Sequence, residues 1–496
     1  MRKFLLLVLS LVTSVTLAQN TVTTAQSGDW DQGSTWSGGD VPDNGDNIIV
    51  DTNHTLTLNV AGVSIRSVVI NNDGNFNVDQ NLTISGLSNS SIQGNMVVRS
   101  TVTISAGDVE IKASNFGLGL SAGNISINSG DQLIFSDSNS NFAINGNLVI
   151  NSDSENFGAV LFKGTASYND FNVTYNRFIT GISTTGNSNW NTISSPAKSV
   201  SANGITLQSN LAQNGAGGDY GIGDYDNTTG ANGTWSTWNS TEAGSVGNLT
   251  PAKGYQMVTD GTGSTIAFTG VFNDNSLSIE ISEGDNAGDA ASATGSRWNL
   301  LGNPYTGYIS ANSNASGASS FGSEYLLTTS ALNKLHANNQ AVYIFNGTSY
   351  ATIGTSTAAA AAVIAPGQGF MVGGKHDDGT QSISFTSNMM TEDGSDDGFS
   401  GDVMPDDDRA ELFISFNQTD IDRRTELYFL DSGSDSFTSA DAGTIDLEYN
   451  GIYSRVVSGE NNVNLAIQTL AYSEMWDKVI PLGINALGGE EMTIGI

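Results

Sequence analysis

A short pattern, Gly-Asn-apolar-x-apolar, recurs four times in the first third of the chain. The copies begin at Gly74, Gly94, Gly123 and Gly146. Each copy reads as a turn followed by a short strand that shows its apolar side chains to one face. One such coil cannot bury that face alone, and periods of about 20 to 30 residues are typical of stacked coils. We therefore predict a parallel β-solenoid over residues 19–165, with an ordinary β-sandwich that has chance Gly-Asn turns as the alternative.

Residues 186–390 contain a second, longer repeat. The segment 190–196, WNTISSP, matches 298–304, WNLLGNP. The segments 251–258, PAKGYQMV, and 266–270, IAFTG, match 366–372, PGQGFMV, and 383–387, ISFTS, in the same order and at nearly the same offset. We predict two copies of a β-sandwich-like module, over residues 166–290 and 291–390. Trp190 and Trp298 are expected to be core anchors, with sugar stacking as the alternative role.

The remaining sequence predicts strands as well. Apolar and polar residues alternate in short bursts between turn residues, and no long window carries the helical period. With 38% hydrophobic residues, a largely disordered chain is not expected. The predicted fold class is all-β: an N-terminal parallel β-solenoid followed by β-sandwich-like modules.

Two groups of aromatic residues are candidates for ligand contact. Trp30 and Trp36 precede the solenoid, where they are expected to cap its open end, with an exposed ligand platform as the alternative. A second group lies in residues 220–238 among Gly, Asn and Asp. Aromatic rings in a polar loop stack on sugar faces while Asn and Asp bond hydroxyls, although the same residues fit a pair of strands with core aromatics. These candidate glycan-binding residues are Tyr220, Tyr225, Trp235 and Trp238.

An acidic linker is predicted at residues 391–408, before a C-terminal β domain at 409–496. Eight acids and no Lys or Arg lie between residues 392 and 408. Clustered carboxylates with Gly turns suit calcium, the one cofactor for which the sequence offers a physical argument, and a self-repelling, solvated linker is the alternative. The sequence stops at residues 492–496 in a strand-like pattern, so we expect the natural protein to continue. The candidate calcium ligands are Asp393, Asp396, Asp397, Asp406, Asp407 and Asp408.

Residues 1–18 have the features of a signal peptide. Arg2 and Lys3 precede an apolar run over residues 4–17, and Thr16-Leu17-Ala18 resembles a cleavage site. The run is shorter than the roughly 20 residues that span a bilayer, which disfavours a membrane anchor. We expect export, cleavage after Ala18, and a mature chain without a transmembrane span.

The composition excludes several classes of function. The chain has 17 Lys and Arg against 50 Asp and Glu, a net charge of −33, so it lacks the cationic surface that nucleic acid requires. No Cys and only three His leave no thiol nucleophile, Cys-ligated metal or HExxH site. Neither a nucleophile elbow nor a phosphate loop is present, and we assign no catalytic residue.

The sequence resembles large secreted or cell-surface proteins of the Bacteroidetes type that are substrates of type IX secretion. The resemblance rests on the Trp30–Val50 opening, on the pair 298–304 and 366–372, and on 409–412, RAEL, with 467–470, IQTL. A C-terminal sorting domain is not present in this sequence. The resemblance implies a location outside the cell or on the extracellular face of the outer membrane, but no single activity.

These observations favour a secreted or surface-displayed structural or adhesion protein that is not an enzyme. Its expected partners are glycans or other cell-surface components, reached through the export machinery. The alternative is a polysaccharide-degrading enzyme, a lyase or glycoside hydrolase, on the solenoid scaffold, because 50 acids offer many carboxylate pairs.

Overall fold

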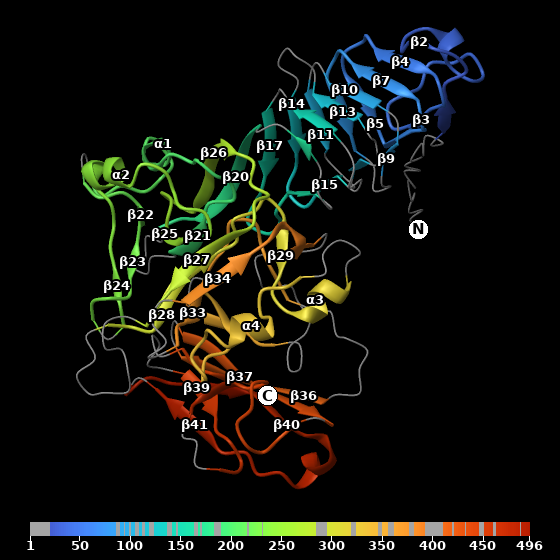
Figure 1. Ribbon diagram of the computed structural model, residues 1–496. Coiled ribbons are helices and arrows are strands. Elements are labelled where there is room, and N and C mark those ends of the chain that lie inside the picture. The colour runs from blue at the N-terminus through green and yellow to red at the C-terminus, as the bar shows by residue number, and fades with distance from the viewer. Residues whose placement is uncertain are drawn as a thin grey trace, which may run out of the picture.

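The chain forms an elongated solenoid, two sheet modules and a C-terminal sheet domain (Figure 1). The computed structural model describes residues 20–496 apart from 86–89, 94, 99–100, 105–108, 112–114, 119–123, 136–140, 145–146, 163–166, 169–170, 183–189, 216–217, 231, 284–294, 319–323, 346–349, 356–361, 376–380, 392–409, 419–420, 432, 446–450, 460–462 and 487. No helix within these residues is long and apolar enough to cross a membrane.

The N-terminal region is a parallel β-solenoid with three sheets, as the repeat predicts. The first sheet contains β1 (Thr21–Thr23), β3 (Asn47–Val50), β6 (Ser67–Ile70), β9 (Ser90–Ile92), β12 (Val109–Ile111), β15 (Gln132–Phe135) and β18 (Ala159–Phe162). The second contains β2 (Gly28–Asp29), β4 (Thr55–Leu58), β7 (Asn75–Val78), β10 (Asn95–Val98), β13 (Asn115–Leu118), β16 (Asn141–Ile144) and β19 (Ser167–Tyr168). The third contains β5 (Val63–Ile65), β8 (Leu82–Ile84), β11 (Thr101–Ile104), β14 (Asn124–Ile127), β17 (Asn147–Asn151), β20 (Asn172–Thr180) and β26 (Gly263–Val271).

The Gly-Asn repeat occupies two of these sheets. Its first two copies form β7 and β10, which pair in register in the second sheet, and its last two form β14 and β17 in the third. The spacing from Gly74 to Gly94 and the spacing from Gly123 to Gly146 therefore each correspond to one turn of the solenoid. The longer spacing, from Gly94 to Gly123, corresponds to one turn plus the step from the second sheet to the third. Inward residues such as Leu56, Phe76 and Met96 stack in one buried column. This stacking excludes the sandwich alternative for the region.

Trp30 and Trp36 close the N-terminal end of the solenoid core. Both are buried, their rings lie 5.0 Å apart edge to face, and Trp36 Nε1 donates to the Trp30 carbonyl at 2.7 Å. Trp30 also stacks on Phe76 of β7, with ring centroids 6.4 Å apart. The pair therefore forms the expected cap, and neither ring is the exposed platform that was the alternative.

The solenoid and the first module share a strand. β20 pairs in parallel with β17 of the preceding turn and antiparallel with β26 of the module, over the whole length of β20. The last turn therefore extends to Thr180, beyond the boundary at residue 165 that the repeat indicated. Because one strand belongs to both parts, the hydrophobic core of the solenoid continues into the module.

The two modules contain short sheets and helices. Copy 1 has β21 (Asn191–Ser194), β22 (Ile222–Gly223), β23 (Tyr225–Asp226), β24 (Thr234–Trp235), β25 (Gly254–Met257), α1 (Ala202–Thr206) and α2 (Ser240–Val246). Copy 2 has β27 (Leu277–Ile281), β28 (Trp298–Gly302), β29 (Tyr308–Ser310), β30 (Val342–Phe345), β31 (Tyr350–Ile353), β32 (Val363–Ile364), β33 (Gly369–Gly373), β34 (Gln381–Phe385), β35 (Met390–Thr391), α3 (Ser313–Ala318) and α4 (Thr329–Leu332). Copy 2 thus begins at β27, earlier than residue 291.

The duplicated motifs pair in the same register in both copies. β21 pairs with β25 so that Ile193 lies opposite Tyr255, and β28 pairs with β33 so that Leu301 lies opposite Phe370. The third repeated segment forms β26 in copy 1 and β34 in copy 2, and each pairs antiparallel with the long strand that opens its copy, β20 or β27. The duplication seen in the sequence is therefore a duplication of strand pairing.

The copies contact each other reciprocally. The Ser194 amide donates to the Gly367 carbonyl at 2.8 Å, and at the equivalent positions the Gly302 amide donates to the Ala252 carbonyl at 3.0 Å. Ala252 and Gly367 share a left-handed backbone, with φ of 63° and 64°. The same two segments thus supply both halves of the contact, as in a two-fold dimer.

The C-terminal domain is one sheet in the order β41 (Leu482–Asn485), β39 (Gly451–Ser454), β40 (Leu465–Ala471), β37 (Ile421–Leu430), β36 (Ala410–Gln418) and β42 (Thr493–Gly495), with β38 (Ala442–Gly443) on β40. Tyr428 and Ile467 of this sheet join one core with Trp298 and Tyr343 of copy 2. Trp298 is thereby the buried anchor that the sequence predicts, whereas Trp190 is half-buried.

Candidate functional site

The hairpin β23–β24 of copy 1 places an aromatic pair at the surface. Tyr225 lies opposite Trp235 across the two strands, and their ring centroids are 4.8 Å apart at 56°. Tyr225 is buried, whereas Trp235 is 38% exposed. The outer ring therefore rests on an inner ring that the protein core holds.

Hydrogen bonds fix the orientation of Tyr225. Its hydroxyl donates to the Asn232 carbonyl at 2.8 Å and lies 3.1 Å from Ser296 Oγ at the start of copy 2. Burial raises the pKa of Tyr225 to about 12, although the Ser296 contact opposes the rise. The phenol therefore stays neutral and acts as a donor at physiological pH.

Hydroxyl groups line the turn beside Trp235. Asp226 Oδ1 accepts from the Thr228 amide at 2.8 Å and from its hydroxyl at 2.7 Å, and these bonds hold the pKa of Asp226 below its usual value. Thr229 and Thr234 are exposed, and their hydroxyls are 3.1 Å apart. The turn thus presents polar groups of both donor and acceptor character next to an aromatic face.

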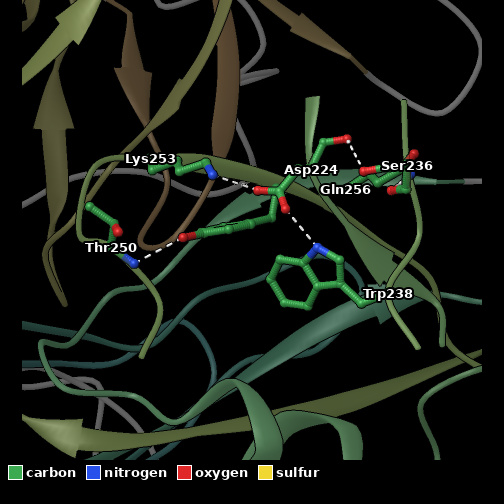
Figure 2. Close-up of polar contacts among 7 residues, drawn as sticks. Asp224, Ser236, Trp238, Thr250, Lys253 and Gln256 are labelled. Carbon is green, nitrogen blue, oxygen red and sulfur yellow. Dashed lines mark hydrogen bonds and ion pairs between the residues drawn. The ribbon is translucent and has the colours of Figure 1, made fainter. Parts of the chain in front are cut away.

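A second cluster, shown in Figure 2, attaches the same loop to the core. Asp224 accepts from Trp238 Nε1 through Oδ2 at 2.6 Å, and Lys253 Nζ lies 2.5 Å from its Oδ1. Gln256 Nε2 donates to the Ser236 carbonyl at 2.7 Å. These bonds join β25 and the residue before it to the loop that carries β23 and β24, so they position the hairpin.

The four candidate aromatics therefore separate into different roles. Trp238 is buried edge to face against Tyr255 at 5.5 Å, and Tyr225 is buried as described, so the core alternative holds for both. Tyr220 is half-buried and packs on the core shared with the solenoid. Of the four, Trp235 is the exposed one, and its ring packs on Tyr225.

The six candidate calcium ligands fall within residues 392–409, outside the described residues. In the part of the chain that the structure describes, no three His, Asp or Glu side chains gather as a metal site.

Sequence reasoning missed that the aromatic pair is itself duplicated. In copy 2, Phe345 lies opposite Tyr350 on β30–β31, with ring centroids 5.0 Å apart at 49°. The signal was available, because Trp235 and Tyr350 have the same separation in sequence as the starts of the matched segments 251–258 and 366–372. In copy 2, however, Tyr350 packs against the core that contains the C-terminal domain.

Residues 95–496 match the model of a family described as Domain of unknown function (DUF8693). No curated protein and no solved structure matches the chain.

Proposed function

We propose that this chain, which belongs to the DUF8693 family of unknown function, is a non-catalytic adhesion or structural protein that contacts glycans through copy 1. The observation that carries the proposal is the exposed face of Trp235 beside the hydroxyl-lined turn. A sugar ring stacks on an indole face while its hydroxyls bond neighbouring polar groups. Because Tyr225 already holds the indole, little side-chain entropy is lost when a sugar binds.

We propose further that the protein is exported and displayed at the cell surface or secreted, through the type IX route that the sequence resemblance implies. The support is the signal-like sequence of residues 1–18. N-terminal sequencing of the mature protein from culture medium and outer-membrane fractions tests this location. We expect a start at Gln19, and mature protein confined to the cytosol would contradict it.

The substitution Trp235→Ala tests glycan contact. The full-length mature chain and the variant are compared on an array of soluble neutral oligosaccharides, with Trp476→Ala as the control. Trp476 is 87% exposed on the C-terminal domain, so its loss removes an accessible indole elsewhere. We expect at least a tenfold loss of binding for Trp235→Ala, with the circular dichroism spectrum of a folded chain, and no loss for Trp476→Ala.

Equal binding by both variants would refute the site. The same incubations, assayed for reducing ends and for unsaturated products, test the enzymatic alternative. Release of either product by the wild-type chain would favour a glycoside hydrolase or a lyase over an adhesin.

A further inference from the structure

The third solenoid sheet presents a column of hydroxyl side chains on its outer face. One outward position per strand stacks in register from β5 to β26, and all but one of these residues are Ser or Thr. Each is half-buried or exposed, as short side chains on an uncovered sheet are. The column consists of Ser64, Thr83, Thr103, Ser126, Val149, Thr174 and Thr269.

Amide side chains flank this column. Asn147 and Asn172 lie two positions before it on β17 and β20, and Asn151 and Asn176 lie two positions after it. Asn176 Nδ2 donates to Asn151 Oδ1 at 2.8 Å, and Asn151 Nδ2 donates to Ser126 Oγ at 3.3 Å. The amides thus extend the hydrogen-bonding surface on both sides of the hydroxyl column, and their mutual hydrogen bonds fix their orientation.

Strand geometry makes this face a regular lattice. Neighbouring strands repeat about every 4.8 Å, and outward residues along one strand repeat about every 6.6 Å. None of the column residues or their flanking amides is charged or aromatic, although the chain carries a net charge of −33. The column and its flanking amides therefore form a neutral array of hydrogen-bonding groups on a strongly anionic protein.

The first solenoid sheet shows what an outer face looks like when the protein covers it. Its outward residues Ile134 and Leu161 are apolar and are buried in the core of copy 2. The column of the third sheet and its flanking amides are polar instead, apart from Val149. The column residues are half-buried or exposed, so their hydroxyls are accessible to a polar ligand.

We propose that the outer face of the third solenoid sheet binds the surface of a neutral, linear polysaccharide. This rests on the proposed function and names its substrate class. Hydroxyls and amides both donate and accept, as sugar hydroxyls do, and a repeating polymer matches a repeating array. The column residues and their flanking amides offer no cation to an anionic polymer. A second copy of the chain is a poorer occupant, because it carries the same net charge of −33. It would also bury little apolar area on this face, whereas a stable dimer needs a large buried interface.

The test is depletion of the full-length mature chain from solution by insoluble polysaccharides. Microcrystalline cellulose and chitin are the neutral probes, and cross-linked carboxymethyl cellulose is the anionic one. The variant Thr83→Lys/Thr103→Lys places two adjacent cations in the hydroxyl column. The control is Thr57→Lys/Asn77→Lys, at adjacent, half-buried outward positions of the second sheet, with the same change in charge.

We expect the wild type and the control to bind a neutral probe, and the column variant to bind at least tenfold less, with circular dichroism and melting temperature unchanged. Equal binding by both Lys variants, no binding of the wild type to either neutral probe, or equal binding to the anionic probe would overturn the proposal. A dimer in size-exclusion chromatography that the column variant alone breaks would assign the face to a second copy.

The two proposals fail separately. If the column variant binds polymer like the wild type while Trp235→Ala loses soluble oligosaccharides, the glycan function stands and the lattice proposal falls. If Trp235→Ala binds soluble oligosaccharides normally while the column variant loses polymer, the lattice proposal stands and glycan contact is assigned to the solenoid rather than to copy 1.

Discussion

Copies 1 and 2 have the same strand pairing, but their outer faces differ. In copy 2, the outward residues Trp298, Leu300 and Met371 are apolar and lie in the core shared with the C-terminal sheet. At the equivalent positions of copy 1 stand Trp190, Thr192 and Gln256, and Gln256 bonds the loop that carries the exposed hairpin. The inward residues Ile193 and Tyr255 of copy 1 and Leu301 and Phe370 of copy 2 lie in apolar cores. Strand register is therefore set by the inward residues, and the outward residues decide what each copy contacts.

The largest expected effect comes from removing the covered indole. Trp298 is 1% exposed, so Trp298→Ala should lower the free energy of unfolding by about 4 kcal/mol through lost burial and a cavity. Trp190→Ala, at the half-buried equivalent, should cost about half as much. Chemical denaturation of the full chain measures both. Equal costs would show that the two outer faces are covered to the same extent.

The reciprocal contact predicts the next effect. A Cβ at residue 369 would lie 2.7 Å from the Ile193 amide nitrogen and the Thr192 carbonyl carbon, both backbone atoms of copy 1. Gly369→Ala should therefore cost about 3 kcal/mol, since the copies must move apart. The control is Gly244→Ala in helix α2, where the added Cβ would lie 4.0 Å from Asn203 Nδ2, and it should be neutral or slightly stabilising. Tolerance of Gly369→Ala would show that the copies do not pack as described.

Two adjacent serines test the interface more finely. Ser194 Oγ is buried and lacks a hydrogen-bond partner among the residues described, whereas Ser195 Oγ donates to the Ala197 carbonyl at 2.6 Å. Ser194→Ala should raise the free energy of unfolding by about 1 kcal/mol, and Ser195→Ala should lower it by about the same amount. Thermal melts of the two variants should shift in opposite directions. A fall in stability for Ser194→Ala would mean that its hydroxyl is bonded.

The smallest effect concerns the left-handed residue of each copy. Ala252 has a backbone that favours glycine, and copy 2 has Gly367 at this place. Ala252→Gly should change the free energy of unfolding by less than about 0.5 kcal/mol, because relief of backbone strain is offset by the added unfolded-state entropy and by the loss of a buried methyl group. Gly367→Ala should destabilise by more than about 1 kcal/mol, since its Cβ would also lie 3.0 Å from the Ser194 carbonyl oxygen. Differential scanning calorimetry compares the two variants, and a loss of stability for Ala252→Gly as large as that for Gly367→Ala would contradict the equivalence.

Local pattern was enough to predict the solenoid and the duplication. The inward column of Leu56, Phe76 and Met96 is set by alternation within short strands, which the sequence shows directly. The repeated pairing of Ile193 with Tyr255 could be expected because both partners recur at nearly constant offsets.

Features set by distant neighbours could not be predicted in this way. β20 has a regular alternation, but nothing in it indicates that β17 and β26 lie on its two edges. Tyr225 and Trp235 look alike in the sequence, and burial of Tyr225 depends on Ser296, which comes much later in the chain. The cover over Trp298 comes from Tyr428 and Ile467 in another domain.

The central claim is that copy 1 contacts ligand while copy 2 supports the C-terminal domain. The most direct test is hydrogen exchange of the full chain, with and without a soluble neutral oligosaccharide such as cellohexaose. We expect the oligosaccharide to slow amide exchange at the β23–β24 hairpin, residues 225–235, and to leave exchange at the equivalent β30–β31 strands unchanged. Protection confined to copy 2 or the C-terminal sheet, or no change anywhere, would contradict it.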